Sequence, residues 1–280
     1  MMQATVSQVS QGIYEHIPTE DVVGYLLRER SMLAWAIDGA SPLTAAPFKT
    51  YEDITDSGWF ARRLSQLLEK QFQDIPFSKA QLRNGLQILQ EEYLHDGGDA
   101  QPIWAWPVAA ATVVEIDRTT EPVHMSIHRY ADCFLEVLQG TLPSENHSAR
   151  PAQLPPSYDL WKPYSGFQRK KLVDLWQRRW RQQESECSTA LTLNPASAMN
   201  AVEERREIAT PAHIVLGSDG LSRVWDTYQL MTSEEALHLV VQHGLPSLLH
   251  VLRGFEASAP TGGADLKRRD DASGIHIFLP

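Results

Sequence analysis

Three aspartates in this sequence stand next to short apolar runs, in a pattern that could do metal chemistry. Asp38 follows one apolar run and precedes Gly39. Asp219 follows another and precedes Gly220, while Asp270 stands before the last apolar run. Mg²⁺ and Mn²⁺ take oxygen ligands, keep several waters and need only a few rigid carboxylates. If these strand ends meet in space, the sequence predicts a site for hard divalent cations.

An ordinary structural explanation exists for each of these residues. A single Asp-Gly pair is most often a turn, because both residues favour turn conformations. Asp38 alone would be explained that way, but Asp219 and Asp270 at matching positions favour the metal site. We expect the three carboxylates to converge on one acidic cluster.

Composition narrows the class of protein. The chain has 280 residues, 42% of them hydrophobic and 21% charged, which is typical of a soluble globular protein. Its net charge of -10 argues against a nucleic-acid partner, because no basic stripe is available to replace the counterions of phosphates. No apolar stretch is long enough for a membrane helix, so no membrane partner is expected. The two cysteines, Cys133 and Cys187, and the absence of a signal peptide pattern indicate a reducing compartment, the cytoplasm.

Apolar periodicity predicts the elements that must position the aspartates. Helical spacing over 58–72 and from Ser78 to about 95 predicts an antiparallel helix pair packed on a sheet, with the Ser78 hydroxyl capping the second helix. Two further helices are expected near the other end, one capped by Thr232 and one over 246–255. Between them the pattern predicts a basic helix over 162–186 and a short helix over 193–208, after an irregular stretch at 140–156. Strands are predicted at 32–37, 110–116, 123–129, 133–138, 212–216 and 274–279. This clustering favours an α+β sandwich over a regular βαβ repeat.

The motifs together resemble the metal-dependent type 2C (PPM-type) serine/threonine protein phosphatases, in their short divergent bacterial branch. The resemblance runs from about residue 17 to 279. Thr19-Glu20-Asp21 matches the opening Glu-Asp pair of that family, and Asp38-Gly39 matches its early Asp-Gly. Ser218-Asp219-Gly220 and Asp270-Asp271-Ala272-Ser273 match its two late motifs, with the right order and flanking strands. Tyr130-Ala131-Asp132-Cys133 loosely resembles its mid-chain Gly-Asp motif.

A fold and an activity are implied by this resemblance. The fold is two packed antiparallel β-sheets flanked on their outer faces by antiparallel helix pairs, here one domain over 1–280 with a flap-like insertion at about 140–208. The activity is hydrolysis of phosphomonoesters, using a water activated by two Mn²⁺ or Mg²⁺ ions for in-line attack on phosphorus. The implied partner is a phosphorylated protein (phosphoserine or phosphothreonine) or a small phosphate ester. No protein nucleophile is needed, so the absence of nucleophile motifs is consistent with this activity.

Residue roles also follow from the resemblance. The metal ligands would be the carboxylates of Asp38, Asp219 and Asp270 with the Gly39 carbonyl, while Glu20 and Asp21 would hold metal-bound waters and Asp132 a third, looser ion. Two of these assignments have equally simple alternatives. The pair Glu20-Asp21 could merely flank a strand, and Asp132 could serve a structural role beside Cys133, itself expected to be a small core residue.

Two departures from the family pattern favour a second hypothesis. Active eukaryotic members carry a histidine just after the Asp-Gly pair, where this chain has Ala40 and Ser41. The early arginine that grips the substrate phosphate has no equivalent between Gly12 and Pro18. The alternative is therefore a catalytically weak or inactive phosphatase-fold module with a regulatory or binding role.

The basic stretch over 162–186 has two interpretations. It carries Arg178 and Arg179 among seven basic residues, with Trp176 and Trp180, in an acidic chain. One interpretation is a solvated helix face with tryptophans packed on the core. The other is a flap whose arginines attract a phosphorylated or acidic substrate in place of the missing early arginine. Elsewhere, Trp104 and Trp106 are expected to pack in the core, and the histidines lack the spacing of a zinc site.

Overall fold

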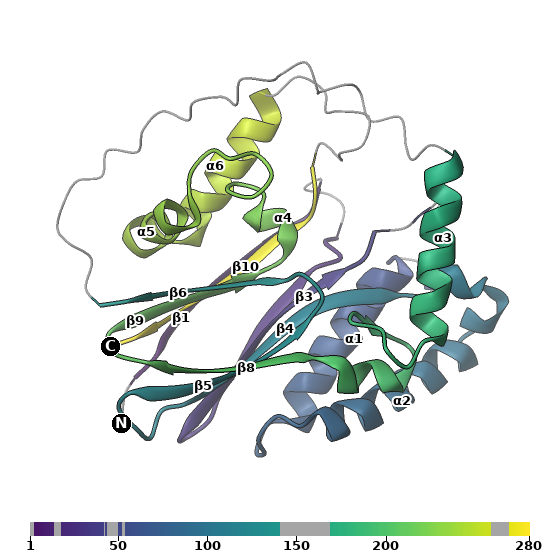
Figure 1. The fold of residues 1–280 in the computed structure, drawn as a ribbon, viewed down its shortest axis with the longest axis horizontal. Helices are drawn as coiled ribbons and strands as arrows, with labels where there is room; N and C mark the ends of the chain where they lie inside the picture. The colour runs from purple at the N-terminus through teal and green to yellow at the C-terminus, as the bar shows by residue number, and fades with distance from the viewer. Residues whose placement is uncertain are drawn as a thin grey trace.

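Two antiparallel sheets lie face to face, and helices cover the outer face of each (Figure 1). The computed structural model describes residues 3–13, 18–41, 43, 50–51, 54–140, 169–258 and 269–280. One sheet has four strands in the order β1 (Thr5–Gln11), β10 (Ala272–Leu279), β9 (Ala212–Gly217) and β6 (Phe134–Gln139). The other has the order β2 (Val22–Leu27), β3 (Ser31–Gly39), β4 (Val108–Asp117), β5 (Val123–Tyr130) and β8 (Val202–Ile208), with the short β7 (Leu191–Thr192) also paired to β4.

A helix pair packs on each sheet, as the sequence predicts. On the six-stranded sheet lie α1 (Asp56–Gln71) and α2 (Lys79–His95), and on the four-stranded sheet lie α5 (Ser233–His243) and α6 (Leu245–Ser258). The remaining helical pieces are α3 (Arg169–Glu184), α4 (Asp219–Ser222) and the 3₁₀ turns η1 (Gly98–Ala100), η2 (Ile103–Ala105) and η4 (Pro195–Asn200). The predicted fold class, two antiparallel sheets with outer helix pairs, is confirmed. Among the described residues, no helix is long and apolar enough to cross a bilayer.

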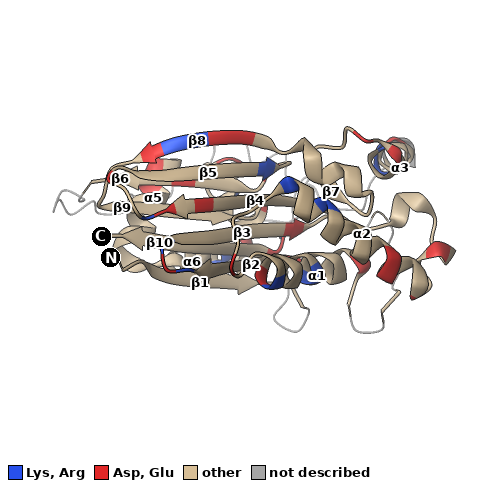
Figure 2. Ribbon diagram, turned by 90° about the horizontal axis from the view of Figure 1, so that it is seen from below, with Lys and Arg blue, Asp and Glu red and all other residues tan. Residues whose placement is uncertain are grey.

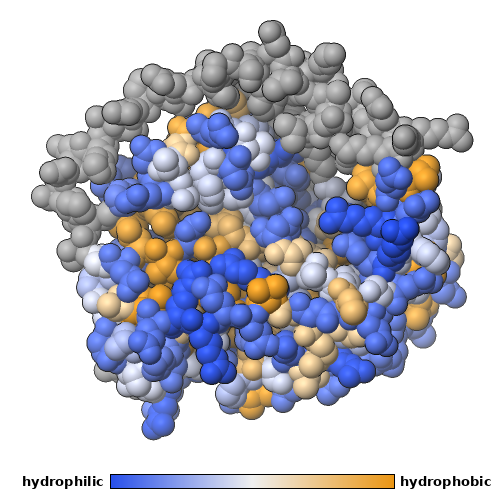
Figure 3. Space-filling view, in the orientation of Figure 1, coloured by the Kyte–Doolittle hydropathy of each residue, from blue (hydrophilic) through white to orange (hydrophobic). Residues whose placement is uncertain are grey.

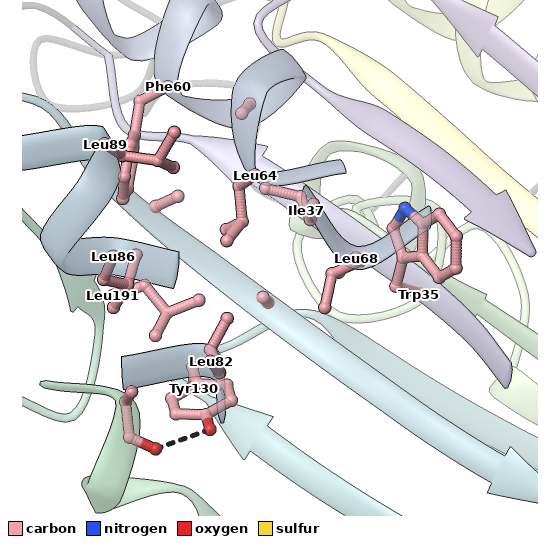
Figure 4. Close-up of a cluster of buried hydrophobic side chains, with 14 of the residues drawn as sticks. Trp35, Ile37, Phe60, Leu64, Leu68, Leu82, Leu86, Leu89, Tyr130 and Leu191 are labelled. Atoms are coloured by element: carbon pink, nitrogen blue, oxygen red, sulfur yellow. Dashed lines mark hydrogen bonds between the residues drawn. The ribbon is translucent and has the colours of Figure 1, made fainter. Parts of the chain in front are cut away.

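Three apolar layers hold this sandwich together. The middle layer lies between the sheets and includes Met32, Ile127 and Ile275, all almost fully buried. The layer under α1 and α2 centres on Trp35 and Leu64, and its edge is pinned by the Tyr130 hydroxyl, which donates to the Ala198 carbonyl at 2.7 Å (Figure 4). The layer under α5 and α6 includes Val215, Leu237 and Leu252. Successive side chains of a strand point to opposite faces of its sheet, and both faces of each sheet carry a buried apolar layer. A shift by one residue would exchange the two faces, so this packing fixes the register of the strands.

Helix starts show where local capping signals succeed and fail. The side chain of Thr55 accepts a hydrogen bond from the Gly58 amide at 3.1 Å and caps α1. Thr232 caps α5, as predicted, in a capping box with Glu235. Ser78 occupies the cap position of α2, but its hydroxyl makes no capping bond, so that prediction is wrong in detail.

The predicted helix over 193–208 is wrong. Residues 202–208 form β8, the edge strand of the six-stranded sheet, paired antiparallel with β5. Its Glu and Arg residues have good helix propensity, but the open edge of β5 provides backbone partners that outweigh it. Charges along β8 (Figure 2) suit an edge strand, since they discourage pairing with another molecule. Strands β1 and β2 were not predicted either, because their burial is too irregular for a clear period.

Candidate active site

The predicted metal residues lie at strand ends from both sheets. Asp38 stands at the end of β3 in the six-stranded sheet. Asp219 begins α4 directly after β9, and Asp270 lies just before β10, so these two come from the four-stranded sheet. The register pairs Gly217 with Gly274, which places the end of β9 beside the start of β10. The sandwich therefore brings both sheets' contributions to one end.

Asp38 and Asp219 are in direct contact across the two sheets. Each carboxyl group acts on the pKa of the other, so the two do not ionise independently in the metal-free chain. Loss of hydrating water raises the pKa of Asp38 well above its ordinary value, and the charges of Asp21, Asp219 and Asp270 raise it further. Loss of hydrating water also raises the pKa of Asp219, although this residue is exposed while Asp38 is half-buried.

Asp21 is the most buried carboxyl of the group, with 2% of the residue exposed. Burial raises its pKa well above the ordinary value, the Ser218 hydroxyl opposes this by donating a hydrogen bond, and the charges of Asp271 and Asp270 add to the rise. Its Oδ2 atom is buried without a hydrogen-bond partner among the described residues. Asp21 therefore lies inside the acidic cluster, deeper than the water-holding role predicted for it requires.

Asp271 fastens the Glu20-Asp21 segment to the late motif. Its Oδ1 accepts the Ile13 amide at 2.8 Å and its Oδ2 accepts the Glu20 amide at 2.5 Å. Both oxygens are thus used on backbone, and the side chain is nearly buried. The sequence placed Asp271 inside a motif without giving it a role, and the structure shows that it positions the opening Glu-Asp pair.

The two Asp-Gly pairs are places of close approach rather than turns. A Cβ atom on Gly220 would lie 1.7 Å from the Asp271 carbonyl oxygen. On Gly39 it would lie 2.8 Å from the Glu20 carbonyl oxygen, which accepts the Gly39 amide at 3.3 Å. Neither glycine has a positive φ. Each glycine thus lets the chain beside one aspartate touch the chain beside another.

A ring of polar contacts supports Asp270 from behind. Arg223 Nη1 lies 3.7 Å from the Asp270 carboxylate, and its guanidinium lies over the Tyr228 ring. The Tyr228 hydroxyl donates to Glu256, which pairs with Arg253 at 2.6 Å. Arg253 closes the ring by donating to the Asp270 carbonyl at 2.9 Å. Glu256 is 1% exposed, and such a buried carboxylate is tolerated because both its oxygens are used.

On the other side of the cluster, Glu20 accepts a hydrogen bond from the Thr55 hydroxyl at the start of α1. Arg62, about two turns further along α1, donates to the Thr19 carbonyl at 3.1 Å. Burial lowers the pKa of Arg62, while Asp271 and Glu20 act in the opposite direction. Arg62 is half-buried beside the site. By contrast Arg28 is committed elsewhere, in an ion pair with Glu115 at 2.6 Å.

Asp132 and the basic helix lie at the margin of this cluster. Asp132 is exposed on the turn between β5 and β6, and its charge contributes to the raised pKa of Asp219. Arg179, half-buried on α3, donates to the Ser41 carbonyl at 3.3 Å, three residues past Asp38. Burial lowers the pKa of Arg179 to about 10, assisted by Arg178 and opposed by Glu20 and Asp38. Arg178 is exposed, so the two predicted flap arginines point in different directions.

These residues fit a hard divalent cation by charge and donor type. Several carboxylates repel one another, burial has removed water from around Asp38, and the buried Oδ2 of Asp21 has no partner among the described residues. Bringing a cation among them would remove all three costs. Within the described part of the chain, however, no three Asp, Glu, His or Cys side chains are gathered closely enough to enclose an ion. The cluster is thus assembled, but its ligand atoms would have to shift to bind a metal.

Comparison with known proteins shows which solved structures share the fold of this chain. No protein-family model matches the sequence, and no curated protein matches it. The catalytic domain of the serine/threonine phosphatase PstP, solved with two manganese ions, matches with a TM-score of 0.53 and 14% identity, over 100% of this chain and 99% of that one. The chain has the fold of bacterial serine/threonine phosphatases.

Two further structures agree on this phosphatase fold. A serine/threonine phosphatase of S. agalactiae matches with a TM-score of 0.55 and 10% identity, over 99% of this chain and 100% of that one. PppA, a regulatory component of T6SS in Pseudomonas aeruginosa, matches with 0.51 and 15% identity, over 99% and 98%. The matches span nearly the full length of this chain and of each matched chain, so the likeness in fold is not confined to one part.

Proposed function

We propose that this protein is a metal-dependent phosphomonoester hydrolase acting on phosphoserine or phosphothreonine in a protein partner. One observation carries the proposal. Asp21, Asp38 and Asp219 are brought together from three separate chain segments, with raised pKa values and, for Asp21, an unpartnered buried oxygen. Such a cluster is costly unless a cation neutralises it. In a protein with the fold of phosphatases, an acidic cluster of this kind can serve as the metal site of a hydrolase.

In this proposal two Mn²⁺ or Mg²⁺ ions bind to the carboxylates of Asp38, Asp219 and Asp270 and to the Gly39 carbonyl. Glu20 and Asp21 would hold coordinated waters, and Asp132 would lie near a third ion. Bound there, the cations would lower the pKa of a coordinated water and balance the charge of phosphate oxygens. The chain itself contributes ligand geometry: Asp271 holds the Glu20 backbone, and Arg223 and Arg253 hold Asp270.

Arg179 is the residue that we assign to the substrate phosphate. It reaches the loop that follows Asp38, and its charge acts on Glu20 and Asp38. A guanidinium at that position can bind two phosphate oxygens at once. We expect Arg179→Gln to raise KM for a phosphopeptide about tenfold with a smaller change in kcat. An unchanged KM would remove Arg179 from this role.

The alternative, a phosphatase-fold module without efficient catalysis, is favoured by two observations. Ala40 and Ser41 follow Asp38-Gly39, and the cluster's ligand atoms do not enclose an ion among the described residues. A module of this kind could bind a metal or a phosphoprotein as a regulator and turn over slowly or not at all.

Two measurements separate these functions. Hydrolysis of p-nitrophenyl phosphate and of a phosphoserine peptide is followed with Mn²⁺, with Mg²⁺ and after EDTA treatment. Mn²⁺ titration by calorimetry reports binding without turnover. The enzyme requires both signals, each lost in Asp38→Asn but kept in Asp99→Asn, which removes an exposed aspartate of η1. Calorimetric binding without hydrolysis supports the module, and full activity in EDTA contradicts the metal mechanism.

A further inference from the structure

Helix α3 presents two different faces next to the active site. One face carries Trp176, Arg179 and Gln183, spaced as helix neighbours. The Trp176 ring stacks on Trp104 at 4.9 Å between centroids, and Gln183 donates to the Pro107 carbonyl at 2.8 Å. These contacts anchor the second half of the helix beside η2, and Arg179 reaches the loop after Asp38. The helix is therefore held in a defined position relative to the acidic cluster.

On the next face of α3 lies a cavity that the proposed reaction does not use. It has a volume of about 490 Å³ and lies between this face and the segment that follows the helix. Its lining includes Arg178, Arg181 and Gln182, which have the helical spacing of one face of α3. Thr189 lines the cavity from the segment after the helix. Figure 3 shows a strongly hydrophilic surface where α3 lies in Figure 1.

Both guanidiniums in this cavity are available to a ligand. Arg178 and Arg181 are exposed, and neither guanidinium has a hydrogen bond or ion pair within the described residues. One acidic residue, Asp174, also lines the cavity, so the arginines leave it with an excess of positive charge. That excess stands out in a chain whose net charge is -10. Hydrogen-bond donors from Gln182 and Thr189 complete a lining suited to an oxygen anion.

We propose that this cavity binds an acidic side chain of the protein substrate, a few residues away from the phosphorylated residue. The proposal rests on the proposed function for its substrate. Arg178 and Arg179 are neighbours on the helix, so their guanidiniums diverge by about 100° and lie about 10 Å apart. An extended peptide covers that distance in about three residues. A glutamate or aspartate three or four positions from the phosphoserine would then reach Arg178 and Arg181 while the phosphate lies near Arg179.

The test measures binding rather than turnover, so it does not depend on catalysis. Two fluorescein-labelled peptides carry an unphosphorylated serine with glutamates, or with glutamines of the same shape, three and four positions away on either side. Fluorescence anisotropy is recorded with the full chain at low ionic strength. We expect the glutamate peptide to bind about fivefold more tightly, with the preference lost at about 0.5 M NaCl because exposed charges are screened.

Matched variants locate the effect. The double variant Arg178→Ser, Arg181→Ser should lose the preference for glutamate, whereas Arg83→Ser, Arg205→Ser removes two exposed arginines elsewhere and should keep it. Asp174→Asn, which removes the one acidic lining residue, should strengthen the preference. Equal losses in the two doubles, no preference in the parent chain, or no gain in Asp174→Asn would overturn the proposal. Absence of p-nitrophenyl phosphate hydrolysis would instead count against the proposed function and leave the binding result standing.

Discussion

The carboxyl groups of Asp38 and Asp219 lie against each other, although they are positioned by different sheets. Burial and the neighbouring negative charges raise the pKa of both groups, so the metal-free cluster resists full ionisation. A bound cation would neutralise the repulsion between these two carboxyl groups. Their contact also makes the cluster open to tests that do not rely on activity alone.

Asp219→Asn should separate stability from catalysis. An asparagine amide can donate to the Asp38 carboxylate without a shared proton, so the metal-free variant should be about 1 kcal/mol more stable at pH 7, which raises Tm by a few degrees. Mn²⁺-dependent hydrolysis should be lost. Differential scanning fluorimetry in EDTA and an assay with p-nitrophenyl phosphate measure the two effects. A variant that is less stable and still active would contradict both expectations; Asp99→Asn controls for removal of one negative charge.

Asp271→Ala should loosen the opening Glu-Asp pair. The change removes the acceptors of the Ile13 and Glu20 amides and should cost about 2–4 kcal/mol of unfolding free energy. Calorimetry should also show weaker Mn²⁺ binding, because the Glu20-Asp21 segment loses its anchor. Asp271→Asn retains one acceptor, so its stability and Mn²⁺ affinity should lie between those of the parent chain and of Asp271→Ala. If Asp271→Ala leaves both stability and Mn²⁺ affinity unchanged, the positioning role is wrong.

Gly220→Ala should be severely destabilising, while Gly254→Ala should not. A methyl group on Gly220 would overlap the Asp271 carbonyl, a backbone atom that cannot rotate away, so we expect a loss above about 3 kcal/mol. Gly254 lies inside α6 with nothing within 4 Å of an added Cβ, and alanine there should gain about 0.5–1 kcal/mol. Urea denaturation of both variants measures the contrast. Similar free energies for the two would rule out close approach as the reason for Gly220.

His276 should make the protein less stable as the pH falls. Burial, with His213 nearby at 3.0 Å, lowers the pKa of His276 to about 4. The folded chain therefore favours neutral imidazole, so the stability this group contributes is present above about pH 6.5 and is lost as the pH falls toward 4. Because His276 is only partly buried, we expect about 1 kcal/mol between pH 7 and 5.

Urea denaturation at the two pH values measures that loss. His276→Gln should lose about 1 kcal/mol less than the parent chain between pH 7 and 5. His124→Gln, at an exposed position of β5, should follow the parent. A His276→Gln variant with the parent's pH dependence would show that burial of this imidazole is not linked to folding.

Local sequence predicted the elements whose signal lies within the element itself. The apolar run of β3, the stripe of α1 and the Thr232 cap each need only neighbours in sequence, and each was recognised. Strand β8 was mistaken for a helix because its pairing with β5, a distant segment, decides its structure. Strand β1 was missed because it shows no clear period, and among the described residues its sheet partner is β10, at the other end of the chain.

The types of residue that form the site could also be predicted from the sequence, but their arrangement in space could not. The sequence by itself determined which carboxylates were available and that Asp38 and Asp219 follow apolar strands. Only the tertiary structure decided that Asp21 would be the most buried of them, that Asp271 would hold backbone amides, and that Arg178 and Arg179 would face different surfaces. The physical reason is that burial and hydrogen bonding depend on which distant segments pack together, and glycines such as Gly220 allow that contact without marking it in the sequence.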